Sequence, residues 1–378
     1  MTWVPKRLDE LGSVSRGRSR HRPRDAAHLY GGPHPFIQTG DVKHAGLYIT
    51  GFTQTYTEAG LQQSKLWPAG TLCITIAANI ADTAILAIDA CFPDSVIGFN
   101  ADPQQSDARF VKYLFDATIK VRAQQFSQGA TQDNLSQEKL LSLDFAVPAV
   151  GEQTRIADIL STHDDLIENN RRRMALLEES ARLLYREWFV RLRFPGYEHT
   201  RIVDGVPQGW ERAQLEDALV LQRGFDLPTQ DRQDGTVPIY GSTGVLGYHD
   251  KAKATAPGVV TGRSGTLGEV QYVAEDYWPL NTALWVKEFR RVTPLFALFL
   301  LREMDLKQFN GGASVPTLDR KSVHRVEILI PPALLLRSFD DVAVDIFAQI
   351  KHLNTQNQKL RAARDLLLPR LMSGEIVV

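Results

Sequence analysis

Two stretches of the chain carry an apolar stripe whose successive members are three and four residues apart in alternation. The first stripe runs from Ile156 to Trp188 and the second from Phe339 to Leu371. This spacing keeps side chains on one side of a helix over many turns, so it predicts two long helices of the coiled-coil type. The predicted seam residues are Ile156, Leu160, Ile167, Met174, Leu177, Leu184, Trp188, Phe339, Ile346, Ile350, Leu353, Leu360, Leu367 and Leu371.

Four polar residues interrupt these stripes, namely His163 and Asn170 in the first and Asn357 and Arg364 in the second. Polar residues in a coiled-coil seam cost stability and can fix register and partner choice. We interpret His163 as a partly exposed seam residue and not as a metal ligand.

The chain also contains an internal repeat with two offsets. One offset, called the end offset because it aligns the later parts of the two copies, brings Phe126–Leu135 onto Phe309–Leu318. This register continues without a gap to about Phe189. The other offset, called the start offset because it aligns the beginnings of the two copies, brings Trp3 onto Trp210. Because the start offset is larger than the end offset, the first copy has about two dozen more residues between its two matching parts. Long repeats decide the architecture of a chain. Matching ends around divergent middles indicate one mechanical role used twice, with two middles that recognise different things.

The repeat and the stripes together predict an α+β protein in which two globular regions alternate with two long helices. The globular regions are residues 1–148 and 195–332, and the helical regions are residues 149–194 and 333–378. Proline stands directly before each helical region, at a place where it is tolerated.

The first globular region opens with five arginines in nine residues, within a stretch rich in Gly, Ser and Pro that predicts a loop or an extended arm. They are Arg16, Arg18, Arg20, Arg22 and Arg24. Arginine can bridge phosphates or read guanine edges. We favour nucleic-acid contact for this arm over the alternative of a solvated basic loop.

Short strands are expected after the arm, at residues 70–76 and 83–88, and the stretch Phe36–Val42 before them contributes Gln38 and Thr39 as candidate DNA contacts. In the second globular region, Val237–Gly244 resembles the Phe36 stretch.

A strand at residues 258–261 leads into the Gly-rich turn Gly262–Gly268, which presents Arg263 and Ser264. Glycines after a strand can cradle phosphate, but no Lys-Ser/Thr pair follows, so a nucleotide site is weakly indicated. A tight turn that presents its polar side chains to DNA and a plain hairpin turn are both left open. The following stretch, 278–286, adds Asn281 and Thr282 as candidate contacts.

The overall charge is close to balance, with 43 Lys and Arg against 44 Asp and Glu. A protein that binds DNA alone usually has a basic excess, so the balance favours DNA binding within a complex. The two cysteines, Cys73 and Cys91, suggest buried thiols and neither a disulfide framework nor a metal site. With no apolar signal core at the beginning and no apolar run of membrane-spanning length, a cytoplasmic protein is expected.

Motifs for catalysis are missing from the sequence. We find no phosphate-binding loop for ATP, no carboxylate–lysine cluster of a nuclease and no proline–proline–aromatic run of an amino methyltransferase. No metal ligands, cofactor site or catalytic residues are therefore expected. Two alternatives stay open: a methyltransferase or nuclease with an unrecognised site, and a coiled-coil scaffold with two protein-binding heads.

Several pieces in this order resemble the specificity subunits of type I restriction–modification systems, over essentially the whole chain. These pieces are Gly262–Gly268 with Trp278–Thr282, the arginine arm with Phe36–Val42, Val206–Trp210 and the tail Leu366–Ile376. The resemblance implies that 1–148 and 195–332 are target-recognition domains and that the helices 149–194 and 333–378 pair antiparallel.

The resemblance further implies that each domain reads one half of a split, asymmetric target in duplex DNA. Two modification subunits would bind the helices, carry S-adenosylmethionine and methylate adenine. Restriction subunits would add translocation and cleavage with ATP and Mg²⁺. The first stripe, from Ile156 to Trp188, corresponds to about 50 Å of helix. That is the length of about 14 base pairs, so the helix pair is expected to act as a ruler between two DNA-reading heads.

Overall fold

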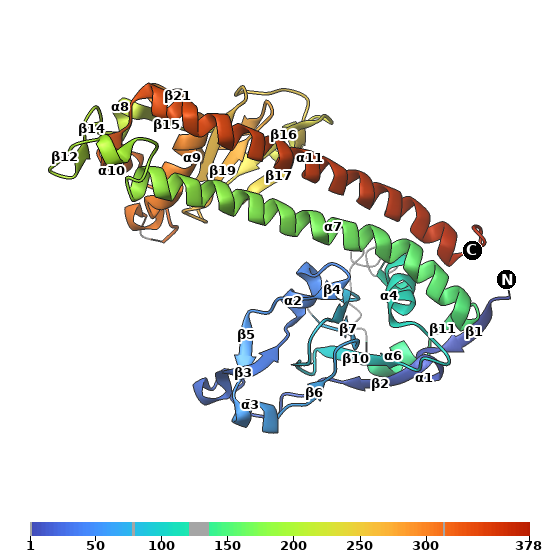
Figure 1. Ribbon diagram of the computed structural model, residues 1–378. Coiled ribbons are helices and arrows are strands. Elements are labelled where there is room, and N and C mark those ends of the chain that lie inside the picture. The colour runs from blue at the N-terminus through green and yellow to red at the C-terminus, as the bar shows by residue number, and fades with distance from the viewer. Residues whose placement is uncertain (1, 78–79, 121–135, 313) are drawn as a thin grey trace. The chain divides into compact units, whose positions relative to one another are not determined.

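The computed structural model describes residues 2–77, 80–120, 136–312 and 314–378, which form two compact units. Unit 1 consists of residues 1–171 and 354–378, and unit 2 consists of residues 172–353. The two long helices of the chain, α7 (Val150–Tyr185) and α11 (Ala333–Met372), each contribute one part to unit 1 and the other part to unit 2 (Figure 1).

Unit 1 contains two sheets and a separate strand pair. The five-stranded sheet has the order β2 (Gly12–Arg16), β10 (Val96–Ala101), β7 (Leu72–Thr75), β8 (Thr83–Leu86), β4 (Tyr48–Ile49). The four-stranded sheet has the order β5 (Gln54–Tyr56), β3 (Tyr30–Phe36), β9 (Ala90–Cys91), β6 (Leu66–Trp67). The strand pair is β1 (Val4–Arg7) with β11 (Asp144–Val147). The shorter helices are α1 (Leu8–Leu11), α2 (Thr39–His44), α3 (Glu58–Gln62), α4 (Ala108–Ala117), α6 (Gln137–Leu141) and the 3₁₀ turn η1 (Ala27–Leu29).

Unit 2 repeats this arrangement with small differences. Its four-stranded sheet has the order β15 (Leu219–Arg223), β21 (Ala283–Phe289), β18 (Gly258–Gly262), β19 (Val270–Val273). Its three-stranded sheet has the order β17 (Gly244–His249), β16 (Val237–Gly241), β20 (Trp278–Pro279). The strand pairs are β14 (Glu211–Gln214) with β22 (Glu327–Ile330), and β12 (Ile202–Val203) with β13 (Val206–Pro207). The helices and helical turns are α8 (Leu215–Ala218), α9 (Pro294–Glu303), α10 (Arg320–His324), η2 (Arg186–Val190), η3 (Tyr197–His199), η4 (Thr229–Asp231) and η5 (Leu306–Phe309).

The repeat found in the sequence recurs in the elements of both units. The start offset, which brings Trp3 onto Trp210, also brings the first residues of β1, α1 and β2 onto those of β14, α8 and β15. The end offset, which brings Phe126 onto Phe309, brings the first residues of α6, β11 and α7 onto those of α10, β22 and α11. The two predicted offsets therefore correspond to the beginning and the end of one fold used twice. The stretch Phe126–Leu135, where the end offset begins, lies outside the described residues.

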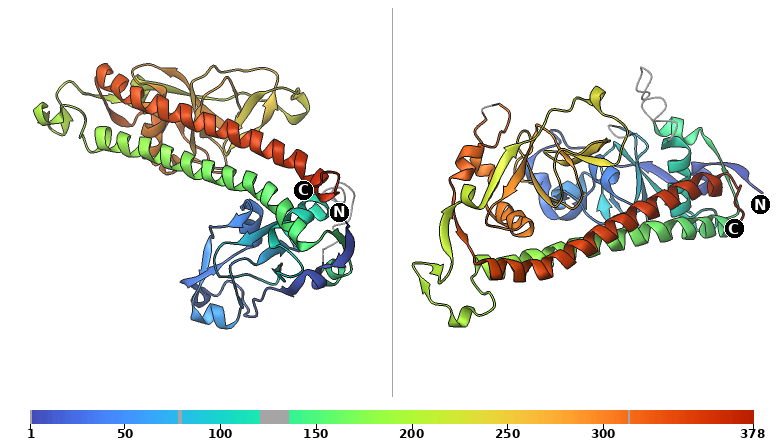
Figure 2. Two further views of the ribbon diagram at one scale, coloured as in Figure 1. Left: turned by 45° about the vertical axis from the view of Figure 1, so that its right-hand side comes forward. Right: turned by 90° about the horizontal axis from the view of Figure 1, so that it is seen from above.

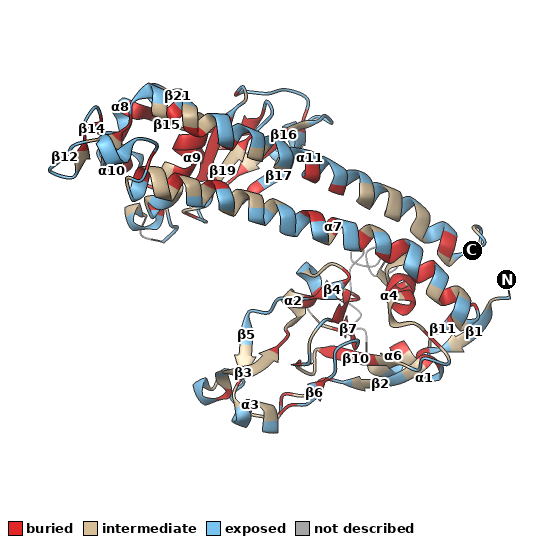
Figure 3. Ribbon diagram, viewed as in Figure 1, coloured by how far each residue is buried: buried red, intermediate tan, exposed pale blue. Residues whose placement is uncertain are grey.

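Each unit has its own apolar core, to which the long helices contribute. In unit 1, Ile97 of the sheet, Phe110 of α4 and Ile156 of α7 are fully buried in one cluster. In unit 2, Phe299 of α9 and Phe339 of α11 have the corresponding role, with ring centroids 6.2 Å apart. Each long helix buries the apolar side chains of one face and exposes the opposite face. Buried and exposed positions therefore alternate along α7 and α11 (Figure 3).

The two long helices pair with opposite direction, as expected (Figure 2). In unit 1, Asn170 contacts Asn357 and, further toward the N-terminus of α7, Asp164 contacts Arg364. In unit 2, the rings of Trp188 and Phe339 lie 6.2 Å apart. All of the seam residues predicted from the stripes are buried or half-buried. The α+β fold class with two long paired helices is thus confirmed, and the predicted boundaries at 148 and 332 lie just before the start of α7 and directly before α11.

Candidate nucleic-acid interface

The four residues predicted as DNA contacts in the second globular region come together at one corner of unit 2. The strands β18 and β21 are neighbours, and their register sets Gly262 opposite Ala283. The residues after β18 and before β21 therefore meet, and the backbone N–H groups of Arg263 and Ser264 both donate to the carbonyl oxygen of Thr282, at 2.9 and 3.1 Å. Arg263, Ser264 and Thr282 are half-buried there.

Asn281 is held at this corner through both its backbone and its side chain. Its backbone N–H donates to Phe225 at 3.0 Å, and its side-chain amide donates to the carboxylate of Asp226. Arg223 forms an ion pair with the same carboxylate at 3.1 Å. The guanidinium of Arg263 donates to the carbonyl oxygen of Asn281 at 3.2 Å. The amide of Asn281 and the guanidinium of Arg263 are therefore oriented by the protein before any ligand is present.

A loop from the repeated segment lies against the Gly-rich turn. The backbone N–H of Gly265 donates to Pro316 at 2.9 Å, and that of Leu318 donates to Arg263 at 2.8 Å. Asn310 closes the loop on itself, because its side-chain oxygen accepts from the N–H groups of Gly312 and Thr317 at 3.0 and 2.9 Å. The turn is the connection between the paired strands β18 and β19, so it is a hairpin connection with a second loop packed on it.

In unit 1, four of the five arginines of the predicted arm bind within the protein. Arg16 donates to the carbonyl oxygen of Asp94 at 3.0 Å, and Arg24 donates to both carboxylate oxygens of Asp94 at 2.9 and 3.0 Å. Arg22 donates to the carbonyl oxygens of Ser19 and His21 within its own loop. These contacts order the arm as a loop with a fixed path.

Arg18 and Arg20 differ in their surroundings. The half-buried guanidinium of Arg18 donates to the carbonyl oxygen of Ser64 at 2.8 Å, while the hydroxyl of Ser64 donates back to the carbonyl oxygen of Arg18 at 2.7 Å. Arg20 is exposed, and its guanidinium has no hydrogen-bond or ion-pair partner within residues 2–77, 80–120, 136–312 and 314–378. The dense arginine pattern thus combines a structural residue with one that is free to meet a ligand.

Gln38 and Thr39 lie where β3 ends and α2 begins. The backbone N–H of Gln38 donates to Asp41 at 2.7 Å in a helix cap, and its side-chain amide donates to Gln54 of the neighbouring strand β5 at 2.6 Å. Gln38 and Thr39 are both half-buried, and Gln54 is exposed.

The same corner exists in both units, although different residues occupy it. Gly17 donates to Val96 at 2.8 Å in unit 1, and Gly224 donates to Ala283 at 3.1 Å in unit 2. A Cβ atom at either glycine would lie 2.2–2.3 Å from a backbone oxygen, so only glycine permits this close approach. Arg16 thereby corresponds to Arg223 and Asp94 to Asn281. Arg16 donates directly to Asp94, whereas Arg223 and Asn281 both bind the carboxylate of Asp226.

The two carboxylates that orient these side chains, Asp94 and Asp226, are not among the residues predicted from the sequence. A lone Asp in a loop has no periodic signal. However, the start offset places Arg16-Gly17 on Arg223-Gly224, and extending the repeat by this pair would have pointed to the shared corner.

Metal-ligand clusters and nucleophilic thiols are two kinds of group on which a catalytic site could be built. The residues described include no group of three or more His, Cys, Asp or Glu side chains that could hold a metal ion. Burial raises the pKa of the thiols of Cys73 and Cys91, which makes both poor nucleophiles. The pKa of His324 is lowered because the ring is partly buried and lies near Arg320, and its Nε2 accepts from the backbone N–H of Leu221 at 3.0 Å.

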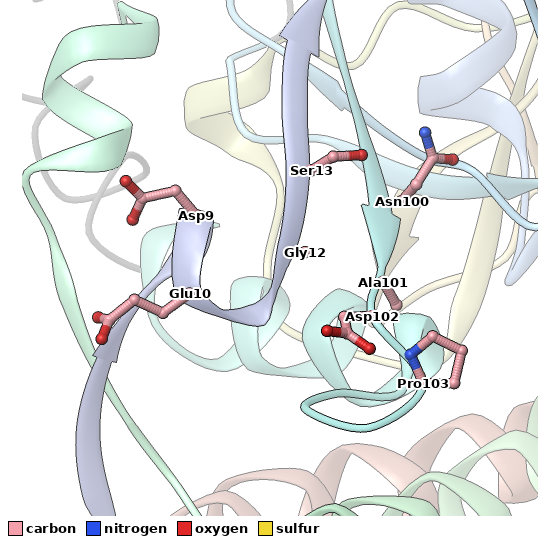
Figure 4. Close-up of a pocket in the computed structure, with 8 residues that line it drawn as sticks. All are labelled: Asp9, Glu10, Gly12, Ser13, Asn100, Ala101, Asp102 and Pro103. Carbon is pink, nitrogen blue, oxygen red and sulfur yellow. The ribbon is translucent and has the colours of Figure 1, made fainter.

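A cavity of about 610 Å³ lies beside α1 in unit 1 (Figure 4). It is lined by Asp9, Glu10, Gly12, Ser13, Asn100, Ala101, Asp102 and Pro103. Glu10 accepts from the N–H of Arg7 at 2.7 Å, and Asp102 accepts from the N–H of Gln104 at 2.9 Å, so both carboxylates serve local backbone groups. Unit 2 sets Leu219 against Phe289 where unit 1 sets Gly12 against Ala101. Gly12 leaves no room for a larger side chain in unit 1, because a Cβ atom there would lie 2.2 Å from the carbonyl oxygen of Asn100.

Within the described ranges, no helix is both long and apolar enough to cross a membrane.

Comparison with known proteins gives one consistent result. A family model described as the type I restriction modification DNA specificity domain matches residues 1–179 and 207–361. The specificity subunit of the type I restriction enzyme MjaIX from Methanocaldococcus jannaschii is 24% identical over 414 residues, which cover 100% of this chain and 94% of that protein. The specificity subunit of the type I restriction enzyme HindI from Haemophilus influenzae is 21% identical over 339 residues, which cover 66% of this chain and 72% of that protein.

A solved structure shares the fold. The S subunit of a type I restriction-modification system from M. genitalium superposes with a TM-score of 0.60 at 16% sequence identity, and the match covers 98% of this chain and 96% of that chain.

Proposed function

The chain belongs to the family of type I restriction–modification DNA specificity domains, and we propose that it is the sequence-reading subunit of such a complex. Each unit recognises one half of a bipartite, asymmetric site in duplex DNA. The observation that carries this proposal is that one scaffold occurs twice with different residues at the same corner. Two different readers on one chain are suited to two different half-sites.

The corner residues have the chemistry that base reading needs. Arginine pairs with the O6 and N7 atoms of guanine, and asparagine or glutamine pairs with N6 and N7 of adenine. In unit 2 we assign DNA contact to Arg263, Ser264, Asn281 and Thr282. In unit 1 we assign it to Gln38, Thr39 and the exposed arginines of the arm, of which Arg20 has no guanidinium partner among the described residues. Arg18 is assigned to the scaffold instead, because its guanidinium is bound to Ser64.

The outer faces of the long helices are suited to partner subunits. Leu176 and Leu334 in unit 2 and Leu366 in unit 1 expose 70%, 77% and 72% of their surface. Burying apolar side chains of this kind against a partner would favour association. We assign this surface to two modification subunits, with restriction subunits joining if the system cleaves DNA.

The catalytic chemistry is assigned to those partners and not to this chain. The modification subunits would carry S-adenosylmethionine and methylate adenine after the base leaves the helical stack. ATP and Mg²⁺ would belong to restriction subunits. The near-neutral charge of the chain fits this division, because partner subunits can supply many of the phosphate contacts that a lone DNA-binding protein needs. The complex would act in the cytoplasm.

Reconstitution tests the proposal directly. The purified chain, its modification subunits and their mixture are each incubated with genomic duplex DNA and methyl-labelled S-adenosylmethionine. We expect sequence-specific transfer in the mixture alone. Methylation or cleavage by the chain alone would identify it as an enzyme with an unrecognised site. Stable partner binding with no effect on DNA selection would identify it as a scaffold.

A further inference from the structure

The seam between α7 and α11 contains a buried pair of asparagines. The side-chain amide of Asn170 donates to the side-chain oxygen of Asn357 at 3.0 Å, and the amide of Asn357 donates to the carbonyl oxygen of Ile167 at 3.3 Å. Asn170 is 6% exposed and Asn357 is 1% exposed. Each side-chain amide donates to an oxygen atom of the other helix. Because both residues are buried, water could not replace these hydrogen bonds if the helices changed their alignment, and the amides would be left unpaired.

A second buried polar contact lies six residues earlier in α7. The carboxylate of Asp164, whose side chain is 6% exposed, accepts from the guanidinium of Arg364 on α11 and from the hydroxyl of Tyr113 on α4, the latter at 2.6 Å. Burial and the neighbouring carboxylate raise the pKa of Tyr113, so the hydroxyl stays a donor. This contact ties both long helices to the globular part of unit 1.

The apolar seam alone does not choose one alignment. Because seam residues repeat every seven positions on average, sliding α11 by seven residues would again place apolar side chains opposite one another at most positions. The asparagines would then be mismatched. In one direction Asn170 would face Ile350 and in the other it would face Arg364, and Asn357 would lose its partner in both cases.

The repeat offers a further wrong pairing, in which α7 packs on the α7 of a second copy. The end offset places Asn170 on Leu353 and Asn357 on Met174, so Asn170 would face Met174 of the other copy. Asp164 corresponds to Phe347 and Arg364 to Ala181. In unit 2 these equivalent positions are apolar, and the ring of Phe347 lies 6.1 Å from that of Phe299. The polar partners are complementary only between α7 and α11.

We propose that Asn170–Asn357 and Asp164–Arg364 form a register lock, which admits one alignment of α7 with α11 and disfavours both the shifted alignments and the pairing of like helices. Asn170, Asn357, Asp164 and Arg364 are thereby positioning residues for the two DNA-reading units. The consequence for the target rests on the proposed function. A single helix register yields a single spacer length between the two half-sites.

Cysteine pairs in the full-length chain report the register. Met174→Cys with Leu353→Cys reports the observed alignment, and Met174→Cys with Leu360→Cys or with Ile346→Cys reports an alignment shifted by seven residues in either direction. Each pair is introduced into the natural sequence and into the Asn170→Leu/Asn357→Leu background. The double substitution leaves no unpaired amide, so it is expected to fold. A matched control is Ile167→Val/Leu360→Val, which alters the packing of the seam without altering its polarity. For the reporter pair that uses Leu360→Cys, the control is Ile167→Val alone.

We expect only the observed-register pair to form a disulfide in the natural background and in the control. In the leucine background, at least one shifted pair should crosslink to at least a tenth of the extent of the observed-register pair, or light scattering should detect a new dimer. A leucine variant with one register and an unchanged mass would overturn the lock.

The adenine methylation map supplies a readout that a merely structural role would not change. We expect the reconstituted leucine variant to methylate sites with more than one spacer length, whereas the natural chain and the control keep one. If the natural chain gave no bipartite motif, the proposed function would fail while the crosslinks still tested the lock. If the natural chain gave a bipartite motif and the leucine variant methylated the same motif with the same single spacer, the proposed register lock would be contradicted.

Discussion

At the scale of the residue, two arginines of the same arm have different environments. Arg18 is fixed to the carbonyl oxygen of Ser64, 46 positions along the chain, whereas the exposed guanidinium of Arg20 has no partner among the residues described. Both side chains have the same charge, so their roles differ only through what the fold brings beside them.

Substituting these arginines separately should distinguish scaffold from reader. Arg18→Ala removes a charge-assisted contact worth about 1.5–3 kcal/mol, and we expect the melting temperature of the full chain to fall by roughly 5 °C. Arg20→Ala should leave the melting temperature unchanged but reduce the salt dependence of DNA binding by about one phosphate contact. Calorimetry and binding titrations at several salt concentrations measure the two effects. An Arg20 variant with unchanged DNA binding would remove this residue from the interface.

The half-buried side chain of His324 leads to a prediction about how stability depends on pH. Its pKa is lowered in the folded state, mainly by burial, and its neutral ring accepts from the backbone of Leu221. The unfolded chain therefore binds more protons at this position, so stability is lost as pH falls below the ordinary histidine pKa of about 6.5. We expect the drop in melting temperature between pH 7.5 and pH 5 to be smaller in His324→Gln than in the natural chain. Equal drops in both would contradict this assignment.

Side-chain partners were the part of the site that the sequence could not predict. Residue type and turn placement predict Arg263, Ser264, Asn281 and Thr282 as DNA contacts, and the structure brings these four residues to one corner. Asp226, which orients Asn281, carries no pattern of its own because it is a lone acidic residue in a loop. Whether an arginine binds DNA or a carbonyl oxygen depends on contacts made by residues far away in the sequence.

At the scale of the element, periodicity predicted the long helices well and the strands less completely. The alternating stripe of α7 and α11 extends over many turns, so chance matches are averaged out. The stretch Trp278–Val286, a continuous run in the sequence, contains parts of two strands, β20 and β21, which lie in different sheets. The chain crosses between sheets at residues 280–282, and a short apolar run does not reveal such a crossing. Asp164 and Tyr113 lie off the stripe, so the pattern did not show their contact.

The paired helices should act as a ruler whose length can be changed. Seven residues inserted between Arg171 and Arg172, and seven between Thr355 and Gln356, preserve the seam spacing and the polar pairs. The insertion adds about 10 Å of helix, or about three base pairs of DNA. We expect the methylated motif to keep both half-sites and to gain a spacer longer by that amount. A motif with its original spacer would show that the helices do not set the gap.

At the scale of the whole molecule, the chain is one fold used twice with different middles. The elements that begin the two units are related by the start offset and those that end them by the smaller end offset, so the difference in length lies between them. This organisation followed from the sequence because the repeat offsets do not depend on any single residue. The target sequence does not follow, because base recognition depends on a few side chains and on the DNA itself.

Exchange of one middle should change one half of the target. Residues 12–143 are replaced by the corresponding segment of another family member, which keeps β1, β11 and both long helices. We expect a new sequence in one half-site, with the other half-site and the spacer unchanged, as read by sequencing methylated DNA. A change in both half-sites would contradict the assignment of one unit to each half.

The central claim is that this chain selects a bipartite DNA sequence for methylation by its partners. The most direct test is the adenine methylation map of a host that carries the intact gene, compared with the same host lacking it. The account predicts the loss of one bipartite, asymmetric motif with all other methylated motifs unchanged. Identical maps from hosts in which the modification subunits are expressed would contradict it.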